Sequence, residues 1–358
     1  MIEGARARMI LDSRGFPTIR VELQSRGRWF GANAPSGAST GKREALEKRD
    51  GGVDWGGKGV ENALAGLRDS LFPEILGRDP RDQKAWDALL LAKDGTAQKE
   101  VLGANAILPV SLAGARVGAH LQGVPLWQWI ATLSDSQPSL PVPTLNVLNG
   151  GVHADNGLDV QEFMVVPHLE TFSLSLKAGV EVYHALHTLL GERGHSVALG
   201  DEGGFAPRLN KNIDALSLVA ESVERAGYRL KEEISLALDV ASSELANPEG
   251  YRWEGGDLSA DALVEIYEGW ADRFPLISIE DGMGEDDRVG WGLLTARLGS
   301  RMRLVGDDLL VTQNEEVKKA IEGELCNALL VKVNQVGTLT QTLEAVEEAR
   351  QGGWAWSV

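Results

Sequence analysis

The second half of the chain alternates short, almost wholly apolar runs with longer stretches of mixed polarity. Runs of Val, Ile and Leu without a polar face are typical of strands buried on both sides, as in a parallel sheet covered by helices. Six or more strand–helix units in about 215 residues favour a barrel over an open sheet. The predicted strands are residues 144–149, 162–167, 234–241, 275–281, 303–311, 328–334 and 354–358.

Several of these predicted strands carry an ionisable residue where the apolar run ends. The four residues are Asp239, Glu280, Asp307 and Lys332, and each interval between them is long enough for one helical crossover. In a parallel barrel the carboxyl ends of the strands meet on one face, where active sites lie. Taken singly, each acid is more simply a helix cap or a surface group. Three buried carboxylates together would need a counter-charge, and ligation by oxygen atoms suits Mg²⁺.

A second group of candidate residues lies in the loops. His153 falls in NGGVHADN, Gln161 and Glu162 come at the start of a predicted strand, and Glu202 falls in GDEGGF. A lone histidine is more often structural than functional. Glu202 is the better candidate for a general acid or base, because the glycines beside it let the backbone approach a ligand closely.

The first third of the chain has a different sequence pattern, which predicts a mixed α+β region. Residues 18–35 alternate around a central glycine, which predicts a β-hairpin. Residues 35–42 form a loop rich in Gly, Ser and Thr, able to close over an anion or to present hydroxyls to a metal. Helices are predicted at 44–50, 61–76 and 102–122. Pro109 is expected to kink or split the last of them.

A segment rich in Ser and Pro separates the regions with these two sequence patterns. It covers residues 131–143, and a stretch of this composition is a typical connection between folded units. We therefore expect two domains, at residues 1–135 and 136–358.

Charge and cysteine content exclude several classes of protein. The net charge of −17 disfavours binding to nucleic acid, because an acidic surface repels phosphates. The single cysteine, Cys326, excludes an intramolecular disulfide and a cysteine-rich metal site, and its apolar neighbours indicate a small buried side chain. The first residues lack the apolar core of a signal peptide, and no apolar run approaches 18 residues, so a cytoplasmic protein is expected.

Ten motifs occur in order from near residue 5 to the last residue. They are ILDSRGFPT, PSGASTGKREALE, DGTAQKEVLGANAIL, LNVLNGGVHADN, QEFMVVP, GDEGGFAP, LALDVASSE, SIEDGMGEDD, LVGDDLLVT and LLVKVNQVGTLTQTLEA. Together they closely resemble the motifs of enolase, the glycolytic phosphopyruvate hydratase.

The resemblance implies a fold and a reaction. The implied fold is a small α+β N-terminal domain that caps a ββαα(βα)₆ TIM-like barrel. The implied reaction is the reversible dehydration of 2-phosphoglycerate to phosphoenolpyruvate, with Mg²⁺ as cofactor. A homodimer, or an octamer built from dimers, is also implied, and some members of the family are reported at the cell surface or secreted.

The resemblance also implies roles for the candidate residues. Lys332 is the base that removes the C2 proton, and Glu202 is the acid that protonates the departing C3 hydroxyl. A nearby dication is expected to favour neutral Lys332, while neighbouring acids and burial are expected to keep Glu202 protonated. The first Mg²⁺ is implied at Asp239, Glu280 and Asp307, and a second, shared with the substrate phosphate, at Ser39. Substrate contacts are implied for His153, Gln161, Glu162, Glu280, Asp307 and Lys332.

The last residues depart from the family pattern. The sequence stops at WAWSV, where the resemblance implies a Ser-His-Arg-Ser loop that grips the substrate phosphate, then an eighth strand and terminal helices. We therefore expect residues 1–358 expressed by themselves to lack turnover. Two alternatives stay open. One is a non-catalytic enolase-like binding protein, and the other is a cycloisomerase or racemase with the same metal trio, which the GDEGG and SGAST motifs disfavour.

Overall fold

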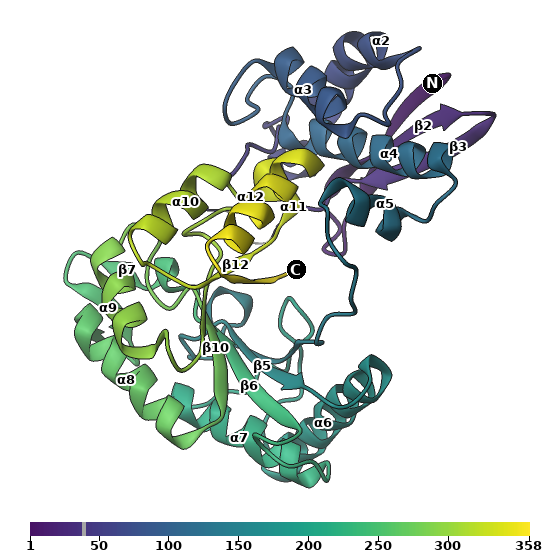
Figure 1. Cartoon of the computed structure of the whole chain (residues 1–358). Coiled ribbons are helices and arrows are strands. Elements are labelled where there is room, and N and C mark those ends of the chain that lie inside the picture. Colours follow the sequence, from purple (N-terminus) through teal and green to yellow (C-terminus); the bar gives the residue numbers. More distant parts are fainter. Residues whose placement is uncertain (38–40) are drawn as a thin grey trace.

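The computed structural model describes residues 1–37 and 41–358 and begins with a three-stranded antiparallel sheet (Figure 1). The strands are β1 (Gly4–Leu11), β2 (Pro17–Ser25) and β3 (Arg28–Asn33), in that spatial order. The predicted hairpin is confirmed. Its two turn residues, Arg26 and Gly27, both have positive φ (49° and 72°), as expected of a two-residue turn that matches the twist of the strands.

Helices pack on this sheet and form the first of two large cores. The predicted helix at 61–76 is confirmed as one continuous helical run with a π-helical turn in its middle. The helical elements are α1 (Glu61–Gly66), η2 (Leu67–Leu71), α2 (Phe72–Ile75), α3 (Gln83–Asp94), α4 (Ala104–Gln122) and α5 (Leu126–Leu133). A short 3₁₀ turn, η1 (Asp54–Gly57), precedes them. The core contains Ile19, Val21, Leu67, Leu90 and Val117, all fully buried.

The predicted split at Pro109 is not observed, because α4 continues from Ala104 to Gln122 across the proline. Pro109 is the sixth residue of the helix, so the missing N–H removes one hydrogen bond near its start. The helix faces β2 and β3, and packing along its whole length outweighs this local loss.

The predicted helix at 44–50 is wrong. Two of its backbone N–H groups bond to distant parts of the chain instead of to a helical partner. Ala45 N–H donates to Gln335 O at 2.7 Å, and Leu46 N–H donates to Gln98 O at 2.7 Å. These tertiary bonds override the helical pattern of the segment and tie it to the second half of the protein.

The second half is built on a seven-stranded sheet in the order β13-β12-β11-β10-β6-β5-β4. All seven predicted strands are present. Their bounds are β4 (Leu145–Asn149), β5 (Glu162–Pro167), β6 (Ile234–Asp239), β10 (Leu276–Glu280), β11 (Arg303–Gly306), β12 (Ala328–Leu330) and β13 (Ala355–Ser357). From β6 to β13 the pairing is parallel, as predicted, whereas β5 runs antiparallel to both of its neighbours. This arrangement matches the ββαα start that the resemblance implies.

Helices cover the outer face of this curved sheet, and a second core lies between the sheet and these helices (Figure 1). The helices are α6 (Phe172–Glu192), α7 (Asn212–Arg225), α8 (Ala260–Arg273), α9 (Arg288–Leu298), α10 (Asn314–Glu322), α11 (Val333–Val336) and α12 (Leu339–Gln351). Two 3₁₀ turns, η3 (Gly151–His153) and η4 (Ser242–Glu244), and a small sheet of β7 (Ala246–Asn247), β8 (Gly250–Trp253) and β9 (Gly256–Leu258) complete the fold. Phe163, Leu236, Tyr267, Ile279 and Trp291 lie fully buried in this core.

Residues 134–144 contain neither helix nor strand and connect α5 to β4. The predicted domain division at 135/136 falls in this segment and stays a prediction. The two halves contact each other through α4 with α11 and through α3 with α12. Among the described residues, none of the helices combines the length and the apolar character needed to cross a membrane.

Candidate active site

Three acids lie in one row across the sheet. Glu162 of β5 is directly opposite Asp239 of β6, and Asp239 is directly opposite Glu280 of β10. Side chains in register on adjacent strands point to the same face. Asp307 follows the last residue of β11, the next strand. Strand register therefore accounts for the meeting of the predicted carboxylates at one end of the sheet.

The carboxylates in this row repel one another. Burial, and next the charge of Asp307, raise the pKa of Asp239 to about 7. Burial, followed by the charges of Asp239 and Asp307, raises the pKa of Glu280 well above its usual value. Lys332 opposes both shifts without cancelling them. A group of acids in this state favours the arrival of positive charge.

Lys332 lies two residues beyond β12 and points to this group. Its Nζ donates to Asp307 Oδ2 at 2.5 Å, and 43% of its side chain is exposed. Burial lowers the pKa of Lys332, but the charges of Asp307 and Glu280 raise it by more, so the net shift is upward. The expected neutral Lys332 is therefore not what these carboxylates favour by themselves.

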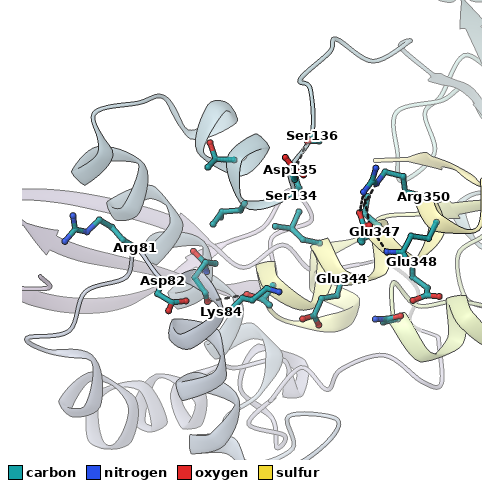
Figure 2. A pocket seen from close by; sticks show the side chains of 18 of the residues that line it. Arg81, Asp82, Lys84, Ser134, Asp135, Ser136, Glu344, Glu347, Glu348 and Arg350 are labelled. Atoms are coloured by element: carbon teal, nitrogen blue, oxygen red, sulfur yellow. Dashed lines mark hydrogen bonds and ion pairs between the residues drawn. The ribbon is translucent and has the colours of Figure 1, made fainter.

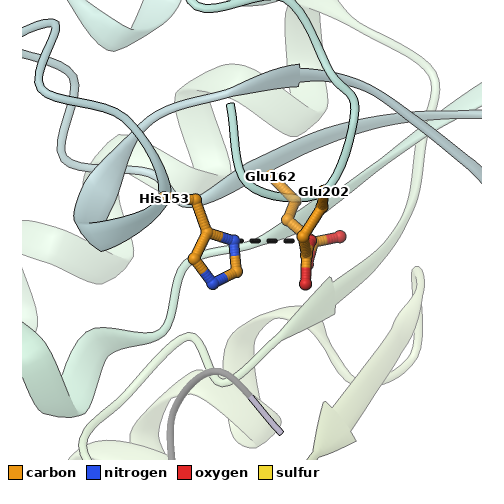
Figure 3. Close-up of side chains that lie close together, drawn as sticks. All are labelled: His153, Glu162 and Glu202. Atoms are coloured by element: carbon orange, nitrogen blue, oxygen red, sulfur yellow. Dashed lines mark ion pairs between the residues drawn. The ribbon is translucent and has the colours of Figure 1, made fainter. Parts of the chain in front are cut away.

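Two loops bring His153 and Glu202 beside Glu162 (Figure 3). His153 Nδ1 lies 3.4 Å from Glu202 Oε2, and the histidine side chain is only 3% exposed. The loop of Glu202 depends on its glycines. Gly203 has a φ of +86°, and a Cβ on Gly204 would lie 2.6 Å from Asn149 Oδ1. Larger residues would push the loop, and Glu202 with it, away from His153.

Glu162 and Glu202 behave as a coupled pair with opposite shifts. Burial, and next the hydrogen bond with Glu202, raise the pKa of Glu162. Burial also tends to raise the pKa of Glu202, but the interactions with His153, Glu162 and Asn146 outweigh it and lower the pKa. Asn146 Nδ2 donates to Glu202 Oε2 at 3.1 Å. The neighbours of Glu202 therefore shift its pKa downward, opposite to the direction expected from burial and the nearby acids, and its role as the acid stays a prediction.

One cavity of about 300 Å³ joins these groups, except that Glu280 is not among the residues that line it. It is lined by Ser13, Arg14, Pro35, Ser36, Gly37, Glu44, His153, Gln161, Glu162, Asp201, Glu202, Asp239, Asp307, Asp308, Lys332 and Asn334. The N-terminal part of the chain supplies the first six of these residues. The lining thus has a lysine at one place, the pair Glu162/Glu202 at another, and Arg14 as a further cation.

Comparison with known proteins agrees with this fold. Residues 2–130 match the family "Enolase, N-terminal domain", and residues 137–358 match "Enolase, C-terminal TIM barrel domain". The chain belongs to the enolase family. A similar relative is the protein named "Enolase" of Natranaerobius thermophilus, which is 46% identical over 358 residues, 99% of this chain and 83% of the relative.

Within this enolase site, Asp281 is a residue that we did not predict. Its Oδ1 accepts a hydrogen bond from Asp307 N–H and its Oδ2 accepts one from Asp308 N–H, both at 2.9 Å. The buried side chain thereby fixes the backbone that carries Asp307. The motif SIEDG contains Asp281 directly after the strand-end Glu280, but nothing in its spacing distinguishes it from a surface acid.

Two groups in the described part of the chain have potential metal-ligand atoms within 4.8 Å of one another. One is His153, Glu162 and Glu202, and the other is Asp281, Asp307 and Asp308. Neither group is the predicted metal trio, of which only Asp307 belongs to one of them. Gln161 Nε2 donates to Asp239 Oδ2 at 3.1 Å, so Gln161 lies against a second member of that trio. Ser39, the predicted ligand of a second Mg²⁺, lies outside the described residues.

Arg14 and Glu44 were also missed, although both lie in motifs that carry the resemblance. Arg14 Nη2 donates to Gly37 O at 2.7 Å and to Ser36 O at 3.1 Å. Glu44 accepts the Gly41 N–H at 3.0 Å, and burial raises its pKa. Both residues therefore anchor the two ends of the Gly- and Ser-rich loop at the cavity.

A larger cavity of about 1,260 Å³ lies elsewhere in the enolase fold, between α3, the end of α5 and α12 (Figure 2). Some of its charged residues pair locally, as Arg350 does with Glu347 and Arg81 with Asp79. Arg81 holds the pKa of Asp79 at about 2 in spite of partial burial. Acids that are ionised and already paired do not supply the proton chemistry of the smaller cavity.

Proposed function

We propose that the protein catalyses the reversible dehydration of 2-phosphoglycerate to phosphoenolpyruvate. The observation that carries the proposal is the single cavity that holds Lys332 against Asp307 and also the pair Glu162/Glu202. The reaction removes a proton from C2 and a hydroxyl from C3, so it needs a base and an acid at separate positions around one small substrate. Membership of the enolase family supports this assignment.

The donor set fits Mg²⁺. Asp239, Glu280 and Asp307 offer carboxylate oxygens, which Mg²⁺ prefers, and the raised pKa values of the first two reflect negative charge that a cation would offset. We assign these three residues to the first Mg²⁺ and Ser39 to the second. When bound, Mg²⁺ would stabilise the additional negative charge that develops on the substrate carboxylate.

Lys332 is the proposed base. In its neutral form it accepts the C2 proton at Nζ, and burial favours that form. The charges of Asp307 and Glu280 hold the proton on Lys332, and these are two of the proposed metal ligands. Occupation of the metal site would therefore weaken the same interactions that keep Lys332 protonated.

Glu202 is the proposed acid, and the proton of the Glu162/Glu202 pair is its source. The raised pKa of Glu162 and the lowered pKa of Glu202 describe one proton shared by two neighbouring carboxyl groups. Transfer of that proton to Oε of Glu202 prepares it to protonate the departing hydroxyl. His153 and Gln161 line the same cavity and are assigned to substrate binding.

The assembly as a homodimer or an octamer of dimers and the cytoplasmic location stay predictions. The activity is tested by incubating the purified protein with 2-phosphoglycerate and Mg²⁺ and following the ultraviolet absorbance of the enol product. In a protein that continues past residue 358 with the Ser-His-Arg-Ser loop, we expect product formation that stops with a chelator and returns with Mg²⁺. Residues 1–358 by themselves are expected to lack turnover. Binding of phosphoenolpyruvate without any turnover by the longer protein would contradict the proposal and support an enolase-like binding protein.

A further inference from the structure

Gln335 is a buried, uncharged residue at the point where the two halves of the protein meet the candidate metal site. It lies in α11, three residues after Lys332, and is 1% exposed. None of the roles assigned above involves this residue. Its side-chain amide nevertheless makes three hydrogen bonds with residues in or beside the site.

Both the nitrogen and the oxygen of the Gln335 amide make hydrogen bonds. Its Nε2 donates to Asp307 Oδ1 at 2.6 Å and to Glu44 Oε1 at 3.3 Å. Its Oε1 accepts from the Thr312 hydroxyl at 2.9 Å. Two carboxylates on one side and a hydroxyl on the other determine which way the amide points, because a carboxylate only accepts hydrogen bonds.

The backbone of Gln335 extends the same connection. Its carbonyl accepts the N–H of Ala45 at 2.7 Å, directly beside Glu44 in the sequence. The N-terminal half is therefore joined to α11 by one backbone bond and one side-chain bond at neighbouring positions. Any shift of this segment relative to α11 would move the amide that holds Asp307.

We infer that Gln335 is a positioning residue that orients Asp307 for the divalent cation. This inference rests on the proposed function. Lys332 holds Asp307 Oδ2 and Gln335 holds Oδ1, so both oxygens of the carboxylate have a fixed direction. Gln335 does this without adding positive charge, whereas a second cation in its place would compete with the metal. Partners of this kind around a ligand affect metal affinity by about 10–100-fold.

The test is the affinity of the purified protein for Mn²⁺ alone, measured by calorimetry with and without Gln335→Met. Methionine has similar length and no donor. We expect Mn²⁺ affinity to fall by about 10–100-fold. Gln83→Met is the matched control, because Gln83 is 2% exposed and its Nε2 donates to Asp87 Oδ1 at 3.0 Å and Ser111 O at 3.3 Å, away from the site. The control is expected to lower thermal stability while it leaves Mn²⁺ affinity unchanged.

The outcomes separate this inference from the proposed function. Wild-type affinity in folded Gln335→Met would overturn the role of Gln335 and leave the metal site standing. Equal weakening by Gln83→Met would overturn it as well, because the effect would then be general. Absence of Mn²⁺ binding by the wild type would overturn the proposed metal site, and this inference with it. Should Gln335→Met not fold, Thr312→Val removes the hydroxyl that orients the amide, and unchanged Mn²⁺ affinity in that variant would refute the inference.

Discussion

Replacement of Glu202 by glutamine separates the two halves of the proposed reaction. The change keeps the size of the side chain and an oxygen that accepts from Asn146 Nδ2, a bond of 3.1 Å in the structure. It removes both the charge and the transferable proton. Because Lys332 is untouched, we expect the C2 proton of 2-phosphoglycerate to exchange with solvent, whereas net dehydration is lost.

The expected loss follows from the role of a general acid. Such groups contribute about 10²–10⁴-fold to the rate, which corresponds to about 3–5 kcal/mol in the activation barrier. The structure adds a second signature. The neighbouring Glu202 carboxylate is the main cause that raises the pKa of His153, so the His153 pKa is expected to fall in Glu202→Gln. His153 would then lose its proton at a lower pH than in the wild type.

Nuclear magnetic resonance measures two of these quantities. Loss of the C2 proton signal in D₂O reports exchange, and the imidazole signals report the His153 pKa. Dehydration is followed by ultraviolet absorbance. Lys332→Ala is the partner variant and is expected to lose exchange and dehydration together. Loss of exchange in Glu202→Gln combined with retained exchange in Lys332→Ala would show that the two roles are reversed. An unchanged His153 pKa would refute the pairing of His153 with Glu202.

Three further predictions concern the metal, the core and the response to pH. Asp239→Asn is expected to weaken Mg²⁺ binding at least tenfold in calorimetry, because it removes a buried ligand charge that faces Glu280. Trp291→Ala is expected to lower the free energy of unfolding in urea by about 3–5 kcal/mol, since the ring is fully buried and its Nε1 donates to Gly284 O at 3.2 Å. Burial tends to raise the pKa of Glu22, but hydrogen bonds from Arg6 and Arg20 lower it overall. The stabilisation is therefore present above the unfolded pKa of about 4.3 and lost as the pH falls through the lowered value, so Glu22→Gln should destabilise at neutral pH and have no effect in strong acid.

The strands of the second half could be predicted because both faces of each strand are buried, so that its sequence is almost wholly apolar. A strand buried on both faces has no polar positions to obscure it, and each of the seven predicted strands is present. β1 was missed for the opposite reason. Arg6 and Arg8 occupy its exposed positions and pair with Glu22 on β2, so its sequence does not read as apolar.

Local patterns failed where distant segments supply the hydrogen bonds. Residues 44–50 have a helical pattern, yet the N–H groups of Ala45 and Leu46 bond to carbonyls far along the chain. The same reason hid Gln335 and Glu44, which are 291 residues apart and meet only in the folded protein. Strand ends, by contrast, are brought together by the regular register of the sheet, so Asp239, Glu280 and Asp307 could be found from spacing.

The location of a proton depends on still finer detail than the location of a residue. Glu162 and Glu202 are both acids that burial pushes toward the neutral form, and sequence reasoning placed the proton on Glu202. In the structure, His153 and Asn146 reach Glu202 from two other segments and lower its pKa, whereas burial and the neighbouring Glu202 raise the pKa of Glu162. A change at either of those two neighbours would therefore redistribute the proton within the pair without altering Glu202 itself. The motif therefore predicts Glu202 as the acid, whereas the pKa of Glu202 depends on side chains that other segments bring to it.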